Sequence, residues 1–168
     1  MKDLSLLAKL LAEEDIHVVH RQQQTAMFDV LNRELSLPIW KDMSKNIQDL
    51  MTLHEVGHAL WTPLEMMDKV KEQKISFSVV NVLEDVRIEK AIQLKYKGAV
   101  KIFNKGYQEL IHSNFFETIG KDIKNYNLID RINLHYKHHI DVPFSDDEMV
   151  WVKNCLLYTS PSPRDLRA

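Results

Sequence analysis

Apolar side chains recur along most of this chain at the three- and four-residue spacing of amphipathic helices. Pro63 and Gly98 interrupt the pattern, and each is expected to end a helix. Ser145 and Glu148 form a capping box, which is expected to begin the last helix. The predicted helices cover residues 2–14, 43–60, 64–74, 77–96, 99–112, 115–119 and 123–136, followed by the one that begins near residue 145.

Two short segments near the N-terminus have a different pattern. Residues 16–20 and 25–31 are rich in side chains that favour strands, and the polar residues 21–24 lie between them. These segments predict a β-hairpin, and the Leu-Pro-Ile-Trp run at 37–40 predicts a turn into the helix at 43–60. The expected fold class is therefore α+β and mainly helical, with a short N-terminal β-hairpin placed before a long central helix.

The central predicted helix contains the run His-Glu-Val-Gly-His at residues 54–58. Residues four apart lie on one face of a helix, so the imidazoles of His54 and His58 can bind one metal ion. Neutral imidazole is a good ligand for zinc, and zinc lowers the pKa of a bound water to about 7. The Glu55 carboxylate is placed to accept that proton. The alternative interpretation is an ordinary amphipathic helix with two buried, hydrogen-bonded histidines.

A zinc site with two histidines needs a third protein ligand. The run Asn-Val-Leu-Glu-Asp-Val-Arg-Ile-Glu at residues 81–89 offers three carboxylates, Glu84, Asp85 and Glu89. Asp85 and Glu89 share one helix face, whereas Glu84 aligns with Arg87. Periodicity does not choose among the three. The alternative is a solvated acidic face paired with neighbouring basic side chains.

The segments LHEVGHALWTP at 53–63 and NVLEDVRIE at 81–89 resemble zincin-like metallopeptidase domains of bacteria and tailed phages, which often precede a von Willebrand factor A-like domain. The similarity extends over roughly residues 16–110. It implies a gluzincin-type site, in which a glutamate on a second helix is the third zinc ligand. By this resemblance, the Zn2+ ligands are His54, His58 and Glu84, Glu55 is the catalytic base, and the substrate is a peptide or protein.

Two other functions remain as alternatives to a peptidase. One is a catalytically inactive zinc-binding module that interacts with another protein. The other is an accessory subunit of an ATPase complex, in which the ATPase must be a separate chain because no phosphate-binding loop is present. Glu55 favours catalysis over both, since a purely structural zinc site has no need of it.

Residues 155–168 (CLLYTSPSPRDLRA) differ in character from the rest of the chain. They resemble the translated read-through of a transposase adapter used in sequencing libraries. We therefore expect residues 1–154 to be the zincin-like domain and residues 155–168 to be a non-native tail, with the native gene continuing past residue 154 into a von Willebrand factor A-like domain. The tail holds the only cysteine, so neither a disulfide nor a cysteine-based metal site is expected.

Charge and hydropathy restrict the choice of partners. The chain has a net charge of −2; the tail contributes +1, which leaves −3 for residues 1–154. This is the opposite of the basic footprint of a nucleic-acid-binding protein. No apolar run approaches the length of a membrane span, and residues 2–14 lack the continuous apolar core of a signal peptide. We expect a cytoplasmic protein of a bacterium or phage-infected cell, with neither nucleic acid nor membrane as a partner.

The remaining histidines are not expected to bind metal. We interpret His17 and His20 as surface or partly buried polar residues, because they lie in a strand-like run. His135, His138 and His139 have helical spacing but lack a carboxylate at a matching position, which indicates a solvated face.

Overall fold

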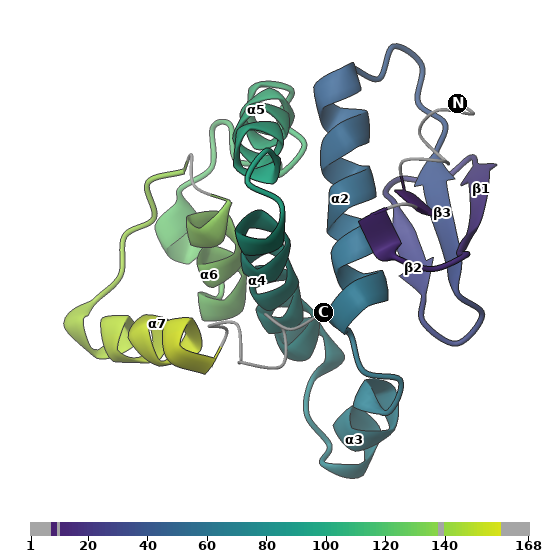
Figure 1. The fold of residues 1–168 in the computed structure, drawn as a ribbon. Helices are drawn as coiled ribbons and strands as arrows, with labels where there is room; N and C mark the ends of the chain where they lie inside the picture. Colours follow the sequence, from purple (N-terminus) through teal and green to yellow (C-terminus); the bar gives the residue numbers. More distant parts are fainter. Residues whose placement is uncertain (1–7, 10, 138–139, 159–168) are drawn as a thin grey trace.

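The computed structural model describes residues 8–9, 11–137 and 140–158, and Figure 1 shows their arrangement. The fold is α+β and mainly helical, as predicted. Its strands are β1 (His17–Arg21), β2 (Met27–Asp29) and β3 (Glu34–Pro38). Its helices are α2 (Lys45–Trp61), α3 (Met66–Glu72), α4 (Phe77–Lys95), α5 (Ala99–His112), the 3-10 helix η1 (Ile123–Asn125), α6 (Leu128–Tyr136) and α7 (Asp146–Tyr158).

The three strands form one small sheet in the order β1-β3-β2. β1 runs parallel to β3, and β2 runs antiparallel to it with Phe28 opposite Leu35. The predicted hairpin between residues 16–20 and 25–31 is therefore wrong, because each of these segments pairs with β3. β3 itself was not predicted as a strand. Its residues 35–38 are all buried, so it has no alternation of apolar and polar positions, and its last residue, Pro38, suggested a turn.

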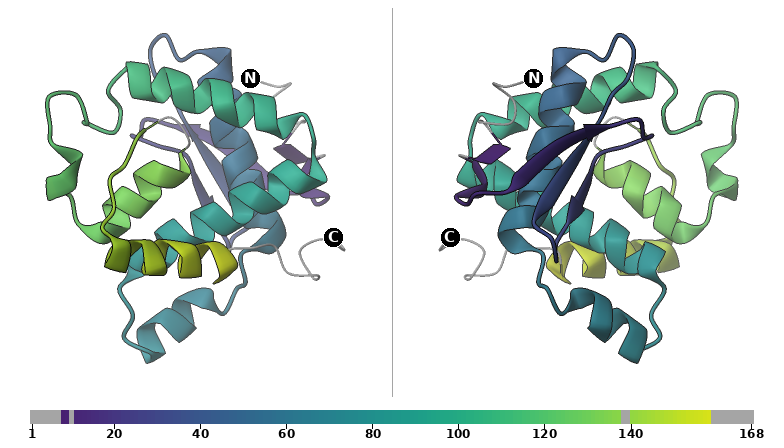
Figure 2. Two further views of the ribbon diagram at one scale, coloured as in Figure 1. Left: turned by 90° about the vertical axis from the view of Figure 1, so that its left-hand side faces the viewer. Right: turned by 90° about the vertical axis from the view of Figure 1, so that its right-hand side faces the viewer.

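Helix α2 lies in the middle of the molecule. The sheet packs on one side of it, and α4 and α5 pack on the other (Figures 1 and 2). The main hydrophobic core fills these two contacts and includes the fully buried Leu35, Val56 and Ile88. A second, smaller core joins α4 to α6 and α7 through Val82, Val86, Ile132, Tyr136 and Val152.

Local signals explain where α2 and α7 begin. The Ser44 hydroxyl accepts a hydrogen bond from the backbone N–H of Ile47 and so caps α2. Ser145 and Glu148 make both hydrogen bonds of the predicted capping box at the start of α7. Helix α2 ends at Trp61, two residues before Pro63, as predicted.

Helices α2 and α4 approach closely at Gly57. A Cβ atom at this position would lie 2.9 Å from Cδ1 of Ile88, which is closer than packed carbon atoms tolerate. The absence of a side chain at Gly57 therefore allows the close approach of the two helices that carry the histidines and carboxylates described above.

Other predicted elements differ from the structure in extent. Residues 113–119 form turns and irregular backbone, so the predicted helix at 115–119 is wrong. The part of the predicted helix at 2–14 that the structure describes is helical at residues 8, 9, 11 and 12. Helix α7 runs across residue 154, the predicted boundary with the tail. Among the described residues, no helix is both long and apolar enough to cross a membrane.

Candidate metal centre

Two imidazoles on α2 meet one carboxylate on α4. Nε2 of His58 lies 3.3 Å from Nε2 of His54 and 3.3 Å from Oδ1 of Asp85. The third side of this triangle, from His54 Nε2 to Asp85 Oδ1, is 3.6 Å. These three side chains, the metal group, form the one cluster of possible ligands found among the described residues, and they could hold a metal ion.

The geometry and donor chemistry fit such an ion. Ligands about 2.0–2.1 Å from a tetrahedral zinc lie about 3.3 Å from one another, close to all three distances. Oδ1 of Asp85 is buried and has no hydrogen-bond partner among the described residues, which is costly unless a cation contacts it. Two imidazole nitrogens and a carboxylate oxygen suit zinc and several other divalent transition metals.

The charge of the surroundings also fits a divalent cation. Among the described residues named here, four carboxylates but two cationic side chains surround the metal group, an excess of two negative charges. Burial of unpaired charge is unfavourable, and a divalent ion would offset both. The carboxylates are Glu55, Glu84, Asp85 and Glu89, and the cations are Arg87 and Lys137.

The same excess of negative charge shifts the pKa of His54. Burial alone would lower the pKa of this imidazole, but the charge of Asp85 and the hydrogen bond to Glu89 raise it to about 9. Burial would raise the pKa of Asp85, yet the neighbouring imidazoles lower it below its ordinary value. In the metal-free protein, a proton on His54 therefore supplies part of the missing positive charge.

Contacts behind the imidazoles fix their orientation. Nδ1 of His54 lies 2.9 Å from Oε1 of Glu89, and Nδ1 of His58 lies 2.8 Å from the hydroxyl of Thr62. Thr62 in turn donates to Oε1 of Glu84 at 2.7 Å. Because a carboxylate accepts hydrogen bonds, each Nδ1 carries a hydrogen, which leaves each Nε2 lone pair directed at the metal position.

Glu84, the expected third ligand, does not face the metal group directly. Its carboxylate pairs with the Arg87 guanidinium at 2.8 Å and accepts from Thr62. Arg87 also donates to the carbonyl of Trp61, which holds this pair at the C-terminal end of α2. Asp85, one of the three candidates, is the carboxylate that the structure brings beside the two imidazoles, whereas Glu84 as third zinc ligand stays a prediction from the resemblance.

Glu55 lies between the metal group and the sheet. Its side chain is 5 % exposed, and its carboxylate accepts a hydrogen bond from the backbone N–H of Phe28 on β2. Burial raises the pKa of Glu55, although the nearby imidazoles of His54 and His58 act in the opposite direction. A buried carboxylate with a raised pKa beside a metal site is suited to accepting and releasing a proton.

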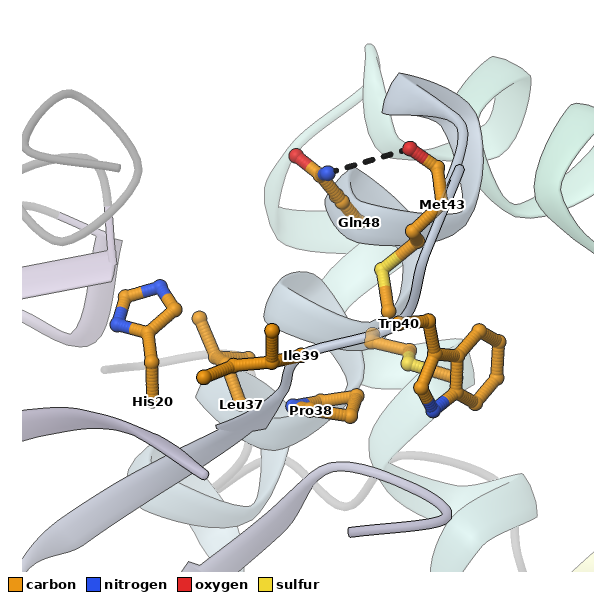
Figure 3. A pocket seen from close by; sticks show the side chains of 8 residues that line it. His20, Leu37, Pro38, Ile39, Trp40, Met43 and Gln48 are labelled. Atoms are coloured by element: carbon orange, nitrogen blue, oxygen red, sulfur yellow. Dashed lines mark hydrogen bonds between the residues drawn. The ribbon is translucent and has the colours of Figure 1, made fainter. Parts of the chain in front are cut away.

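A small pocket lies beside the N-terminal half of α2 (Figure 3). Its volume is about 180 Å³, below the roughly 300–1,000 Å³ of small-molecule sites, so it suits a single side chain. Met51 precedes His54 by three residues and Glu55 by four, so it shares their helix face. The pocket is therefore about one helical turn from the metal group. Its lining residues are His20, Leu37, Pro38, Ile39, Trp40, Met43, Gln48 and Met51.

Of the other histidines, His17 and His20 follow the prediction of surface or partly buried positions, whereas His135 is half-buried and does not lie on the expected solvated face. His17 is exposed, and His20 is half-buried but lines the pocket, a position the sequence did not indicate. His135 packs edge-on against the rings of Tyr136 and Phe144 and is not part of the metal group. Residues 138 and 139 lie outside the described part of the chain.

Three side chains that surround the site, Thr62, Tyr107 and Lys137, were not predicted from the sequence as site residues. Thr62 could have been found, because it follows His58 by four residues and so shares its helix face. Tyr107 and Lys137 are distant in sequence from both motifs, so no local pattern indicated them. Comparison of the chain with protein-family models, with curated proteins and with solved structures gave no significant match.

Proposed function

We propose that the protein is a zinc-dependent peptidase whose metal ligands are His54, His58 and Asp85. The observation that carries this proposal is the convergence of three ligand atoms at tetrahedral spacing beside a second, buried carboxylate, that of Glu55. A site that only holds a metal for stability is normally closed by four protein ligands, whereas three ligands leave a position for chemistry.

Bound zinc would supply Lewis-acid chemistry, polarising a peptide carbonyl and activating a water molecule. The residues of the chain perform the other tasks. Glu55 accepts the proton of the attacking water at its carboxylate and transfers it to the leaving amine, for which its raised pKa is suitable. Glu89 and Thr62 keep the imidazoles of His54 and His58 in the orientation that ligation requires.

Two features beside the site suit a peptide substrate. β2 is an edge strand, so an extended peptide can pair with its outer side by strand addition. The Phe28 N–H of this strand contacts Glu55, and a peptide bound along it would pass the catalytic carboxylate. The adjoining pocket, with walls formed mainly by apolar residues such as Trp40 and Met51, would accept an apolar side chain.

One observation favours a second candidate, a zinc-binding interaction module without turnover. The hydrogen bond between Glu55 and Phe28 also gives this carboxylate a structural role, linking α2 to the sheet. In that case the metal group would stabilise the fold, and the edge strand would hold a partner peptide without cleaving it.

Elemental analysis of the purified chain tests the metal site first. About one zinc per chain is expected, with loss of the metal in His58→Ala. A fluorescent peptide library then tests hydrolysis, with Glu55→Gln as the matched blank because the amide keeps the shape of the side chain but accepts a proton poorly. Activity that persists in Glu55→Gln would rule out the mechanism. Bound zinc without any turnover in the wild type would favour the interaction module.

A further inference from the structure

Lys137 is a buried cation next to the metal centre. Its residue is 6 % exposed, and lysine is almost never this buried unless its charge is paired. Nζ of Lys137 donates to Oε1 of Glu89 at 2.8 Å and to the hydroxyl of Tyr107 at 2.7 Å. The Tyr107 hydroxyl donates to the same Glu89 oxygen. These three side chains form a closed set of hydrogen bonds, the Glu89 triangle.

The Glu89 triangle joins four helices at the metal group. Lys137 follows the last residue of α6, Tyr107 lies on α5, and Glu89 lies on α4. The Glu89 oxygen that both of them contact is also the one that meets Nδ1 of His54 on α2. Figure 1 shows α6 packed along α4, on the side away from the sheet. A single carboxylate oxygen therefore connects the helical second half of the chain to a metal ligand.

We propose that Lys137 is a positioning residue of the metal centre, which together with Tyr107 fixes the Glu89 carboxylate that orients His54. This inference rests on the proposed metal site. A glutamate side chain has several rotatable bonds, and its carboxylate can guide an imidazole only if it is itself held. Two further donors on the same oxygen restrict that motion, and they come from helices that do not carry a metal ligand.

Packing alone does not account for a lysine at this position. Ile132 and Tyr136 of α6 already pack against Val82 and Val86 of α4 in the second core. A buried ion pair adds little net stability compared with apolar side chains of the same size. A methionine would fill the same space as Lys137 and still bury α6 against α4, but it would leave Glu89 with fewer donors. The charge and donors of Lys137 are therefore explained by the carboxylate that they hold.

The test measures zinc affinity of the whole chain by competition with a chromophoric chelator, together with the visible spectrum of the cobalt(II)-substituted protein. Lys137→Met is expected to weaken zinc binding by about tenfold or more and to alter the cobalt spectrum, as loss of an outer contact to a ligand does. Lys137→Arg keeps the cation and its donors, so its affinity should stay within about threefold of the wild type. Tyr107→Phe removes one donor from Glu89, and its affinity should fall between those two variants.

Arg131→Met is the matched control. Arg131 lies on α6, the helix that Lys137 follows; it is also buried, and it pairs with Glu148 at the start of α7 rather than with the metal group. This variant should unfold at a lower temperature but bind zinc normally. An equal loss of zinc affinity in Arg131→Met would show that Lys137 only holds α6 in place, and it would overturn the positioning role. Unchanged or tighter zinc binding in both Lys137→Met and Tyr107→Phe would overturn the inference.

Nitrogen-15 spectra of the histidine rings in the metal-free protein provide a readout that does not depend on metal. The His54 Nδ1 signal should move in Lys137→Met and Tyr107→Phe and remain in place in Arg131→Met. A wild-type chain that binds no zinc would refute the proposed function, whatever these spectra show. A His54 signal that is the same in all the variants would refute the positioning role even if the wild type binds zinc.

Discussion

Oδ1 of Asp85 lies 3.3 Å from Nε2 of His58, and this buried oxygen has no hydrogen-bond partner among the described residues. The adjacent residue, Glu84, contacts the same histidine only through Thr62. Two neighbouring carboxylates on α4 therefore have different relations to one imidazole. One faces the metal position, and the other supports the opposite side of the ring.

This difference predicts unequal effects of two conservative substitutions. Asp85→Asn should lower zinc affinity by more than about 100-fold, because it removes a charged ligand atom. Glu84→Gln should lower it by about tenfold or less, since the amide oxygen can still accept from Thr62. Chelator competition measures both values. The reverse order would restore Glu84 as the third ligand, as the family resemblance implies.

The pKa of His54 predicts how the stability of the metal-free protein depends on pH. Its pKa is about 9 in the folded protein and near 6.5 when unfolded, so the folded state binds more protons between these values. The stabilisation from this group is complete below about pH 6.5 and is lost as the pH rises through about 9. Thermal unfolding of the chelator-treated protein should show this decline, and His54→Gln should reduce it.

Zinc should change the sign of this pH dependence. Ligation requires an unprotonated imidazole, so zinc and the proton compete for His54. With zinc in excess, the unfolding temperature should therefore rise between about pH 6 and 8, where the metal-free protein begins to lose stability. Identical pH profiles with and without zinc would show that His54 is not a ligand.

The sequence predicted the parts of the structure that depend on local signals. Pro63 predicted the end of α2, Gly98 the break between α4 and α5, and the Ser145–Glu148 capping box the start of α7. The strand pairing failed because partners in a sheet are distant in sequence, and β3, buried at four successive residues, carries no two-residue alternation. The hairpin was therefore assigned to the two segments whose composition favoured strands.

The position of Asp85 beside the imidazoles depends on tertiary contacts that no local pattern contains. Ile88 packs on Gly57 and lies between Glu84 and Asp85 on the face of α4, so helical phase alone does not separate these two carboxylates. Arg87 distinguishes the two carboxylates, because it donates to Glu84 and to the carbonyl of Trp61 and so keeps Glu84 at the end of α2. The Glu89 triangle could not be predicted from the sequence either, because Lys137 lies beside Glu89 only when α6 packs against α4.

Gly57→Ala should affect both stability and metal binding. Alanine favours the helix by about 1 kcal/mol, but its Cβ would press on Ile88, and such overpacking costs about 1–3 kcal/mol, so a net loss of about 1 kcal/mol is expected. Any outward movement of α4 also carries Asp85 away from the imidazoles, which should weaken zinc binding severalfold. Denaturant unfolding and chelator competition measure the two effects.

Gly98→Ala is the control for that substitution. A Cβ atom at Gly98 meets nothing within 4 Å, and its φ of −67° is ordinary for any residue. This variant should stay within about 0.5 kcal/mol of the wild type and bind zinc normally. If Gly57→Ala behaves in the same way, the separation of α2 and α4 is not limited by this contact.

The pocket beside α2 predicts a preference for apolar side chains. Met43 and Met51 line it, so their methyl groups report directly on an occupant in spectra of methionine-labelled protein. N-acetyl-leucinamide should shift both signals at millimolar concentration, whereas N-acetylglycinamide, which has no side chain to bury, should not. Met27 and Met67 are exposed and outside the pocket, so their signals should stay constant and exclude a general solvent effect. Equal shifts with both amides would mean that the pocket does not select a side chain, and cleavage beside apolar residues would then need another explanation.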